Sequence, residues 1–216
     1  MRHTGPDLLL PRDLLATRAR ELSGKTLTEA QKDKFSAYYR LVLRWNPRLH
    51  LTTITRPDEF CARHILESLI ASENILFPVS RFYDMGAGMG VPGIPVAILN
   101  PDLPVTMVEA SNKKTVFLKE AIAELGLENT KAHAGRIEEM SELAAGACVA
   151  ARAVEKMEQV VRDIFGIGAG ARQFLFFGGK ELEDRVSTEA PPGMTIRKVL
   201  LPDADARYLF SVERST

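Results

Sequence analysis

A run of alternating glycines constrains the fold of this chain more than any other feature. The segment from Asp84 to Gly93 reads Asp-Met-Gly-Ala-Gly-Met-Gly-Val-Pro-Gly, between a predicted strand at 81–85 and a predicted helix at 91–99. Glycine lacks a Cβ, so the backbone can turn sharply here and come close to a ligand. The loop leads into a helix N-terminus, whose first amides are free to donate. Ligand binding is therefore the favoured interpretation, and a plain strand-to-helix turn is the alternative.

The glycine spacing and two acids indicate the kind of ligand. Nicotinamide and flavin enzymes place a pyrophosphate on Gly-x-Gly-x-x-Gly, whereas the glycines here, which include Gly86 and Gly88, follow Gly-x-Gly-x-Gly. Asp84 would repel a pyrophosphate but suits a ligand with a positive amino group or sulfonium. Glu109 ends the next predicted strand, where an acid can bind the ribose hydroxyls of an adenosine. A solvated acid is the alternative for Glu109. Together these residues predict S-adenosylmethionine as the cofactor.

Strand and helix patterns alternate through the rest of the chain, which predicts an α/β fold with a mostly parallel sheet covered on both faces. Only Pro202–Asp205 separates the last two strands, which indicates an antiparallel hairpin at one edge. The predicted strands are 81–85, 104–110, 129–133, 147–151, 173–177, 194–201 and 206–213, and the predicted helices are 91–99, 111–125, 136–143 and 155–166.

Two helices are predicted before the first strand. Thr28 and Gln31 fit a capping box, and an apolar stripe at helical spacing then runs to Trp45, with Pro47 expected to end the helix. A second helix is expected to open near Pro57, and the first 28 or so residues are expected to form a loosely attached lead-in. We therefore predict an N-terminal helical cap at 1–75 and a cofactor-binding core at 76–216.

Composition limits the partners and the kind of site. The formal net charge is zero, so a nucleic acid would need a local basic surface or a preformed RNA–protein substrate. Cys61 and Cys148 are far apart and have no nearby ligand set, so no metal site is expected. No apolar run reaches the roughly 18 residues of a membrane span, and we expect a cytoplasmic protein, monomeric and not bound to membranes. The candidate basic surface contains Arg40, Arg44, Arg48, Arg56 and Arg63, and a solvated helix face is its alternative.

Four segments resemble the bacterial small-subunit ribosomal RNA guanine-N7 methyltransferases, also called glucose-inhibited division protein B. They are Trp45-Asn46 with Leu51-Thr52, Arg63 to Leu69, Asp84 to Pro95, and Gly135 to Glu139 with Arg152-Ala153 downstream. The resemblance implies a Rossmann-like class I methyltransferase fold with a seven-stranded sheet. It also implies S-adenosylmethionine as cofactor and a guanine of 16S rRNA in the small ribosomal subunit as acceptor.

By residue, the resemblance implies that Gly86 and Val91 line the cofactor loop and that Ile137 and Glu138 flank the adenine. It implies that Arg152 lies near the cofactor, where the target base enters. Three positions depart from the family pattern. His50 stands where asparagine is usual, Glu67 stands where aspartate is usual, and Gly178 lies in the segment where Leu-Lys-Gly is common.

The chemistry needs little from side chains, because guanine N7 carries a free lone pair and in-line transfer of a methyl group requires alignment rather than a general base. His64 and Arg152 are the candidate catalytic residues; a structural histidine and a surface arginine are their alternatives. Three other functions stay open: a methyltransferase for another acceptor, a non-catalytic RNA- or ribosome-binding relative, and a nicotinamide oxidoreductase, which the glycine spacing disfavours. The cofactor-binding candidates are Gly86, Gly88, Val91, Glu109, Ile137, Glu138 and Arg152.

Overall fold

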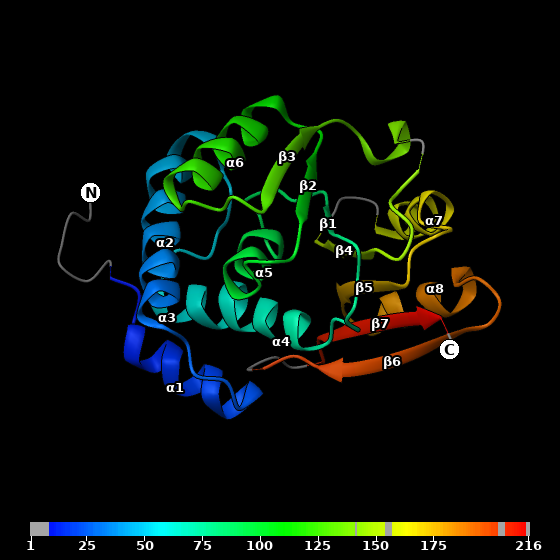
Figure 1. Ribbon diagram of the computed structural model, residues 1–216, viewed down its shortest axis with the longest axis horizontal. Coiled ribbons are helices and arrows are strands. Elements are labelled where there is room, and N and C mark those ends of the chain that lie inside the picture. The colour runs from blue at the N-terminus through cyan, green and yellow to red at the C-terminus, as the bar shows by residue number, and fades with distance from the viewer. Residues whose placement is uncertain (1–8, 141, 154–156, 203–205, 215–216) are drawn as a thin grey trace.

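The computed structural model describes residues 9–140, 142–153, 157–202 and 206–214. Helices lead into a sheet and then alternate with its strands (Figure 1). The helical elements are α1 (Arg12–Ser23), α2 (Glu29–Leu49), α3 (Pro57–Phe60), η1 (Cys61–Leu66), α4 (Glu67–Glu73), α5 (Gly93–Leu99), α6 (Asn112–Glu124), η2 (Ile137–Glu139), α7 (Met157–Ile167) and α8 (Lys180–Glu189). The strands are β1 (Phe82–Met85), β2 (Val105–Glu109), β3 (Thr130–Ala134), β4 (Cys148–Arg152), β5 (Gln173–Gly178), β6 (Met194–Leu200) and β7 (Tyr208–Arg214).

The seven strands form one sheet in the order β3-β2-β1-β4-β5-β7-β6. Strands β1 to β5 pair in parallel, and β7 runs antiparallel to both β5 and β6. The predicted α/β class with a mostly parallel sheet and an antiparallel edge hairpin is confirmed. The chain order reverses between β1 and β4, the kind of position where open α/β sheets bind ligands beyond the carboxyl ends of their strands.

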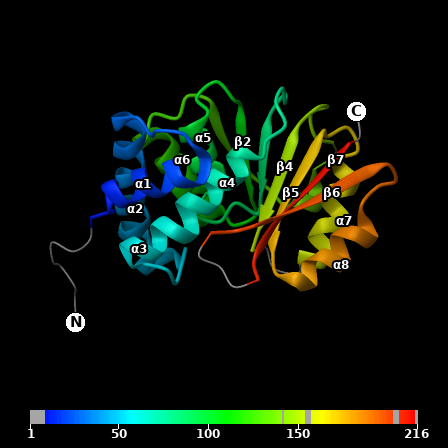
Figure 2. The ribbon, with the colours of Figure 1, turned by 90° about the horizontal axis from the view of Figure 1, so that it is seen from below.

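Helices cover both faces of the sheet (Figure 2). Helices α1, α2, α4, α5 and α6 lie on one side and α7 and α8 on the other, and each side has its own apolar core. The first core joins the early helices to the sheet, because Phe35 and Tyr38 of α2 belong to the same cluster as Phe82 of β1. The division into a cap at 1–75 and a core at 76–216 stays a prediction.

The early helices differ from expectation in two places. Residues 12–23 are not a loose lead-in, because Leu15 and Ala19 of α1 are fully buried in the first core. Helix α2 begins with the predicted capping box at Thr28, but it continues through Pro47 to Leu49. Proline removes one backbone donor, and so close to the end of a long helix that loss is tolerated.

Two later helices also differ. The predicted helix at 136–143 is only the short turn η2, since Met140 is extended and the amide of Leu143 donates to Ile167 of α7. Helix α8 was missed, because only Leu182 and Val186 of its charged sequence are buried. The predicted start of α7 at residue 155 lies outside the described residues.

Candidate functional site

The glycine loop after β1 adopts a backbone that needs glycine. Gly86, Gly88 and Gly90 all have positive φ, at 69°, 56° and 88°, where side chains with a Cβ are strained. A Cβ on Gly88 would find only the carbonyl oxygen of Gly86, 3.9 Å away. The position is therefore open on the side that a side chain would occupy, and the loop forms a backbone cradle at the carboxyl edge of the sheet.

Glu109, at the end of β2, holds this loop in place. Its carboxylate accepts hydrogen bonds from the amides of Gly88 and Ser111, each at 2.8 Å. The Gly135 amide donates to the Glu109 carbonyl at 3.1 Å, which brings the segment after β3 to the same edge. Each carboxylate oxygen can accept a second hydrogen bond, so Glu109 retains capacity for two ribose hydroxyls.

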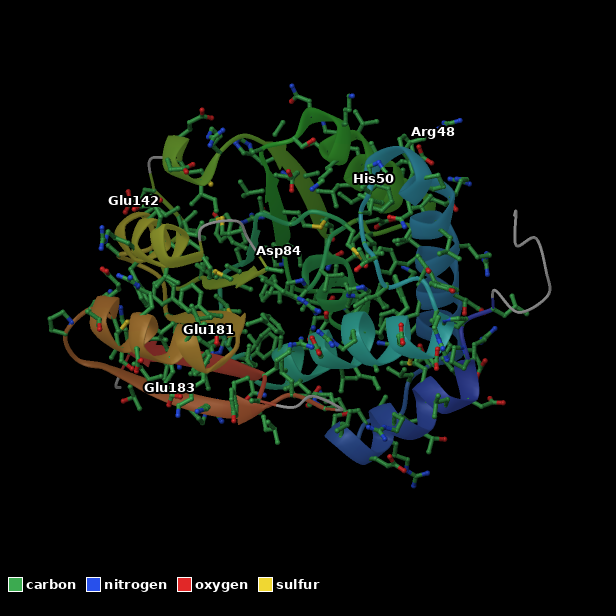
Figure 3. The ribbon with its side chains drawn as sticks, turned by 180° about the vertical axis from the view of Figure 1, so that it is seen from behind. Arg48, His50, Asp84, Glu142, Glu181 and Glu183 are labelled. Atoms are coloured by element: carbon green, nitrogen blue, oxygen red, sulfur yellow. The ribbon has the colours of Figure 1, made fainter. Side chains whose placement is uncertain are left out.

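Asp84 lies in the interior beneath the loop (Figure 3) and is fully buried. One carboxyl oxygen accepts from the Gly93 amide at 2.8 Å, whereas the other has no hydrogen-bond partner among the described residues. Burial raises the pKa of Asp84 to about 7, although the Gly93 hydrogen bond and the charge of Arg152 oppose the shift. A buried acceptor without a donor is costly, so this oxygen fits the positive amino group of a ligand.

A π-helical turn positions the next group of side chains. The segment η1 separates α3 from α4 and contains both Arg63 and His64, and such turns inside helices often occur at functional sites. The His64 Nε2 lies 3.1 Å from the Thr52 hydroxyl. Thr52 is in turn fixed by Asn46, which accepts from its amide and donates to its carbonyl, each at 2.9 Å. This chain of contacts gives the Trp45-Asn46 and Leu51-Thr52 segments a physical role.

His64 is held in its neutral form. Burial lowers its pKa to about 3, and the neighbouring guanidinium charges of Arg152 and Arg63 act in the same direction. Its ring also packs edge-on against Phe60, with the centroids 4.8 Å apart. His64 can therefore offer hydrogen bonds at neutral pH but brings no positive charge.

Glu67, which opens α4, sits at the centre of an arginine cluster formed by Arg63, Arg152 and Arg207. Its side chain is fully buried. Arg207 donates to both carboxylate oxygens at 2.7 Å, Arg152 Nη2 lies 3.0 Å from Oε2, and Arg63 Nε lies 3.1 Å from Oε1. The sequence had singled out Arg152 and Glu67, but nothing in the spacing of Arg207 pointed to this site.

Arg152 ends β4, and its positive charge acts on the buried Asp84 of β1. Its guanidinium also stacks 5.5 Å from the centre of the Phe177 ring. The next residue, Ala153, has a φ of 48°, a conformation that costs free energy in a residue with a Cβ and is often found near functional sites. The alternative reading of Arg152 as an ordinary surface residue is wrong, because only 10% of its side chain is exposed.

The other predicted cofactor residues lie around the same edge. Val91 is buried at the end of the glycine loop and Ile137 is buried in η2, after β3. Glu138 is exposed and lies 3.8 Å from Arg136. Their contacts with a cofactor stay predictions.

Two of the three departures from the family pattern, His50 and Gly178, have local explanations. His50 is the C-cap of α2, with left-handed φ and ψ of 48° and 51°, a conformation that asparagine also favours. Figure 3 places His50 with Arg48 at the end of α2, away from Asp84. Gly178 ends β5 and packs closely on Leu182, so that a Cβ would come within 2.5 Å of it.

Acidic side chains pair with part of the predicted basic surface. Arg44 pairs with Glu120 and Glu124, Arg56 pairs with Asp58, and Arg63 belongs to the arginine cluster. Arg40 and Arg48 are exposed on α2. Two of the five arginines, Arg44 and Arg56, are therefore ion-paired with acidic residues, and an RNA-facing basic surface stays a prediction.

Comparison with known proteins identifies the family. Residues 31–198 match the family model described as rRNA small subunit methyltransferase G. The chain belongs to this family. The family predicted from the sequence is confirmed.

Proteins named ribosomal RNA small subunit methyltransferase G align over different shares of the chain. The one from Streptococcus pyogenes serotype M12 is 32% identical over 95% of this chain and 92% of its own length. The one from Pseudomonas entomophila is 34% identical, over 80% of this chain and 79% of its own. The match to Actinobacillus pleuropneumoniae serotype 5b is 40% identical but spans 54% of this chain and only 56% of that relative.

Solved structures support the fold. A human methyltransferase 10 domain containing protein is 11% identical, with a TM-score of 0.55 over 88% of this chain and 100% of its own. The precorrin-6y C5,15-methyltransferase of Geobacter metallireducens is also 11% identical, with a TM-score of 0.53 over 75% of this chain and 90% of its own. The Rossmann-like class I methyltransferase fold is thus confirmed.

Two kinds of feature are absent from the residues that the structure describes. No helix there is long and apolar enough to cross a membrane. No group of three or more His, Cys, Asp or Glu side chains in those ranges is placed to hold a metal ion.

Proposed function

We propose that this chain transfers the methyl group of S-adenosylmethionine to N7 of a guanine in 16S rRNA of the small ribosomal subunit. The observation that carries the proposal is the glycine cradle with the unpartnered oxygen of Asp84 beneath it, in a chain of this family. The substrate implies action in the cytoplasm, and we propose that the protein acts as a monomer.

The residues present fit the cofactor. The carboxyl group of Asp84 has an unpaired acceptor for its amino group, and the open side of Gly88 leaves room for a ligand against the backbone. Glu109 has free acceptor capacity for the ribose, and Ile137 with Glu138 is proposed to flank the adenine. When bound, S-adenosylmethionine supplies an electrophilic methyl group on a sulfonium.

The protein's own contribution is binding and alignment. Guanine N7 needs no deprotonation, so the neutral state of His64 is compatible with a role as a hydrogen-bonding residue beside the base. Arg152, held against Glu67, is proposed to orient the groups that meet at the carboxyl end of β4. Alignment of the acceptor nitrogen, methyl carbon and sulfur then lowers the barrier by restricting motion.

A methyl-transfer assay tests the function. The wild-type protein is expected to label small subunits that lack the modification when tritiated S-adenosylmethionine is supplied, and digestion with mass spectrometry should place the label on a guanine. Gly88→Val is expected to abolish the labelling and the calorimetric signal of cofactor binding, since valine at a φ of 56° is strained and its side chain enters the cradle.

A methyltransferase for another acceptor and a non-catalytic relative predict other outcomes in the same assay. Label on a protein or a small molecule, with none on RNA, would indicate another acceptor. Calorimetric binding of small subunits without transfer of label would indicate a non-catalytic relative. Wild-type affinity for the cofactor in Gly88→Val would contradict the placement of the cofactor on this loop.

Glu109→Ala is expected to weaken S-adenosylmethionine binding by about 1–3 kcal/mol, the usual cost of losing hydrogen bonds to a charged group. The substitution removes the proposed ribose contacts and also frees the Gly88 amide. Isothermal calorimetry measures the change in affinity. The affinity of Glu109→Gln, which keeps one acceptor oxygen, should lie between those of wild type and Glu109→Ala. An unchanged dissociation constant in Glu109→Ala would mean that the ribose binds elsewhere.

A further inference from the structure

The arginine cluster carries more positive charge than its carboxylate can balance. Three guanidinium groups surround Glu67, so the group has a net charge of about +2, because arginine stays protonated in proteins. Asp84 is the other carboxylate that senses Arg152, but no ion pair joins the two among the described residues. Buried charge without a partner is costly, which suggests that the cluster is completed by an anionic ligand.

Hydrogen-bond donors in the cluster are also left over. Nη1 of Arg152 and Nη1 of Arg207 are buried and have no hydrogen-bond partner in the described part of the chain. Each of these arginines uses Nη2 to hold Glu67. Glu67 thus fixes the guanidinium planes and leaves their other donors unused, and a planar fork of donors of this kind matches an oxyanion.

The three arginines of the cluster differ in how far their side chains are exposed to solvent. The exposed fraction of the side chain is 10% for Arg152, 25% for Arg207 and 37% for Arg63. Arg152 therefore lies at the inner end of the cluster, where its charge acts on Asp84, and Arg207 and Arg63 lie nearer to solvent. A ligand that approaches the cluster from solvent therefore meets Arg63 and Arg207 before Arg152.

We propose that Arg63 and Arg207, fixed by Glu67, bind a backbone phosphate of the RNA next to the target guanine. This phosphate contact rests on the proposed function, because it would hold the RNA substrate at the same site. Phosphate contacts fix the register of a nucleic acid without reading its sequence. In a chain of zero net charge, Arg44 of α2 and Arg56, the N-cap of α3, are already ion-paired. Such a chain needs a local contact of this kind to place one base.

The carboxylate of the cofactor is a second oxyanion that could complete the cluster, and the experiment separates the two sources. Two measurements compare wild type with Arg207→Gln and Arg207→Lys. Filter binding of 16S rRNA over a range of salt concentrations reports the phosphate contact, and calorimetry with S-adenosylmethionine reports the cofactor. Arg162→Gln is the matched control, because it also removes an ion-paired arginine, one bonded to Glu189 at 2.7 Å.

Arg207→Gln is expected to weaken RNA binding roughly tenfold and to reduce the slope of log K against log salt by about 1. The affinity for S-adenosylmethionine should stay within about twofold of wild type. Arg207→Lys should retain the salt slope, because the charge remains, but lose part of the affinity, because the fork is gone. Arg162→Gln should leave both measurements unchanged.

Unchanged RNA affinity and slope in a folded Arg207→Gln would overturn the proposal, as would loss of cofactor binding with RNA binding intact. Thermal melting checks the fold, and if Arg207→Gln does not fold, Arg63→Gln at the more exposed position carries the same test. Wild type that binds RNA through Arg207 but transfers no methyl group would contradict the proposed function and leave the phosphate site standing.

Discussion

Replacement of Glu67 by alanine is expected to lower the free energy of unfolding by about 3 kcal/mol, the lower end of the range for removing one partner of a buried ion pair. The carboxylate is fully buried and contacts three guanidinium groups. Without it, Arg152 loses the carboxylate with which it forms an ion pair, while only 10% of its side chain is exposed. Arg63 and Arg207 reach solvent, which screens their repulsion and keeps the loss at the lower end.

Denaturant unfolding at neutral pH measures this loss. Glu67→Asp is the matched control, since it keeps the charge with a shorter side chain, and it should cost far less than the alanine variant. High salt should recover part of the loss in Glu67→Ala by screening the three arginines. A wild-type midpoint for Glu67→Ala would show that the arginines do not depend on Glu67, and would remove the basis for the fixed guanidinium planes.

The sequence predicted those parts of the site that depend on the local backbone conformation. The positive φ angles of Gly86, Gly88 and Gly90 can be anticipated because only glycine adopts them freely. Glu109 follows a buried strand, so its place at the carboxyl edge follows from the strand itself. The strands were found within one or two residues at most ends, because most residues of the buried parallel strands are apolar.

The parts that the sequence did not predict depend on contacts between distant residues. Arg207 reaches Glu67 across 140 positions of the chain, and no local pattern records that approach. Helix α8 has too thin an apolar stripe to show helical periodicity. The region after η2 has helical composition, but the hydrogen bond from Leu143 to Ile167 draws it into an extended path. In this last segment tertiary packing outweighs local preference.

The Asp84→Asn substitution is expected to stabilise the fold at pH 8 by about 1–3 kcal/mol while weakening the cofactor complex. The folded protein holds the Asp84 proton up to a pKa of about 7, whereas an unfolded chain releases it near pH 4. Between these values the folded state binds more protons, so the wild-type stability attributable to this group falls as pH rises through that window. Asparagine carries no charge and can still accept from the Gly93 amide, so it avoids this loss.

Urea unfolding at pH 5 and pH 8 separates this effect from a general change in packing. The advantage of Asp84→Asn over wild type should be small at pH 5 and largest at pH 8, and the exposed Asp102→Asn control should show no such change. An advantage of the same size at both pH values would contradict a buried, titrating carboxyl.

Cofactor binding should respond in the opposite sense, because an ionised Asp84 is the proposed partner of the amino group of S-adenosylmethionine. Calorimetry should show wild-type affinity falling as pH decreases from 8 to 6, as Asp84 takes up its proton, and Asp84→Asn should bind weakly at every pH in that range. If Asp84→Asn bound as tightly as wild type, with the same pH dependence, the amino group would have to lie elsewhere in the crevice. The unpartnered carboxyl oxygen therefore links a cost in fold stability to a gain in ligand binding at one atom.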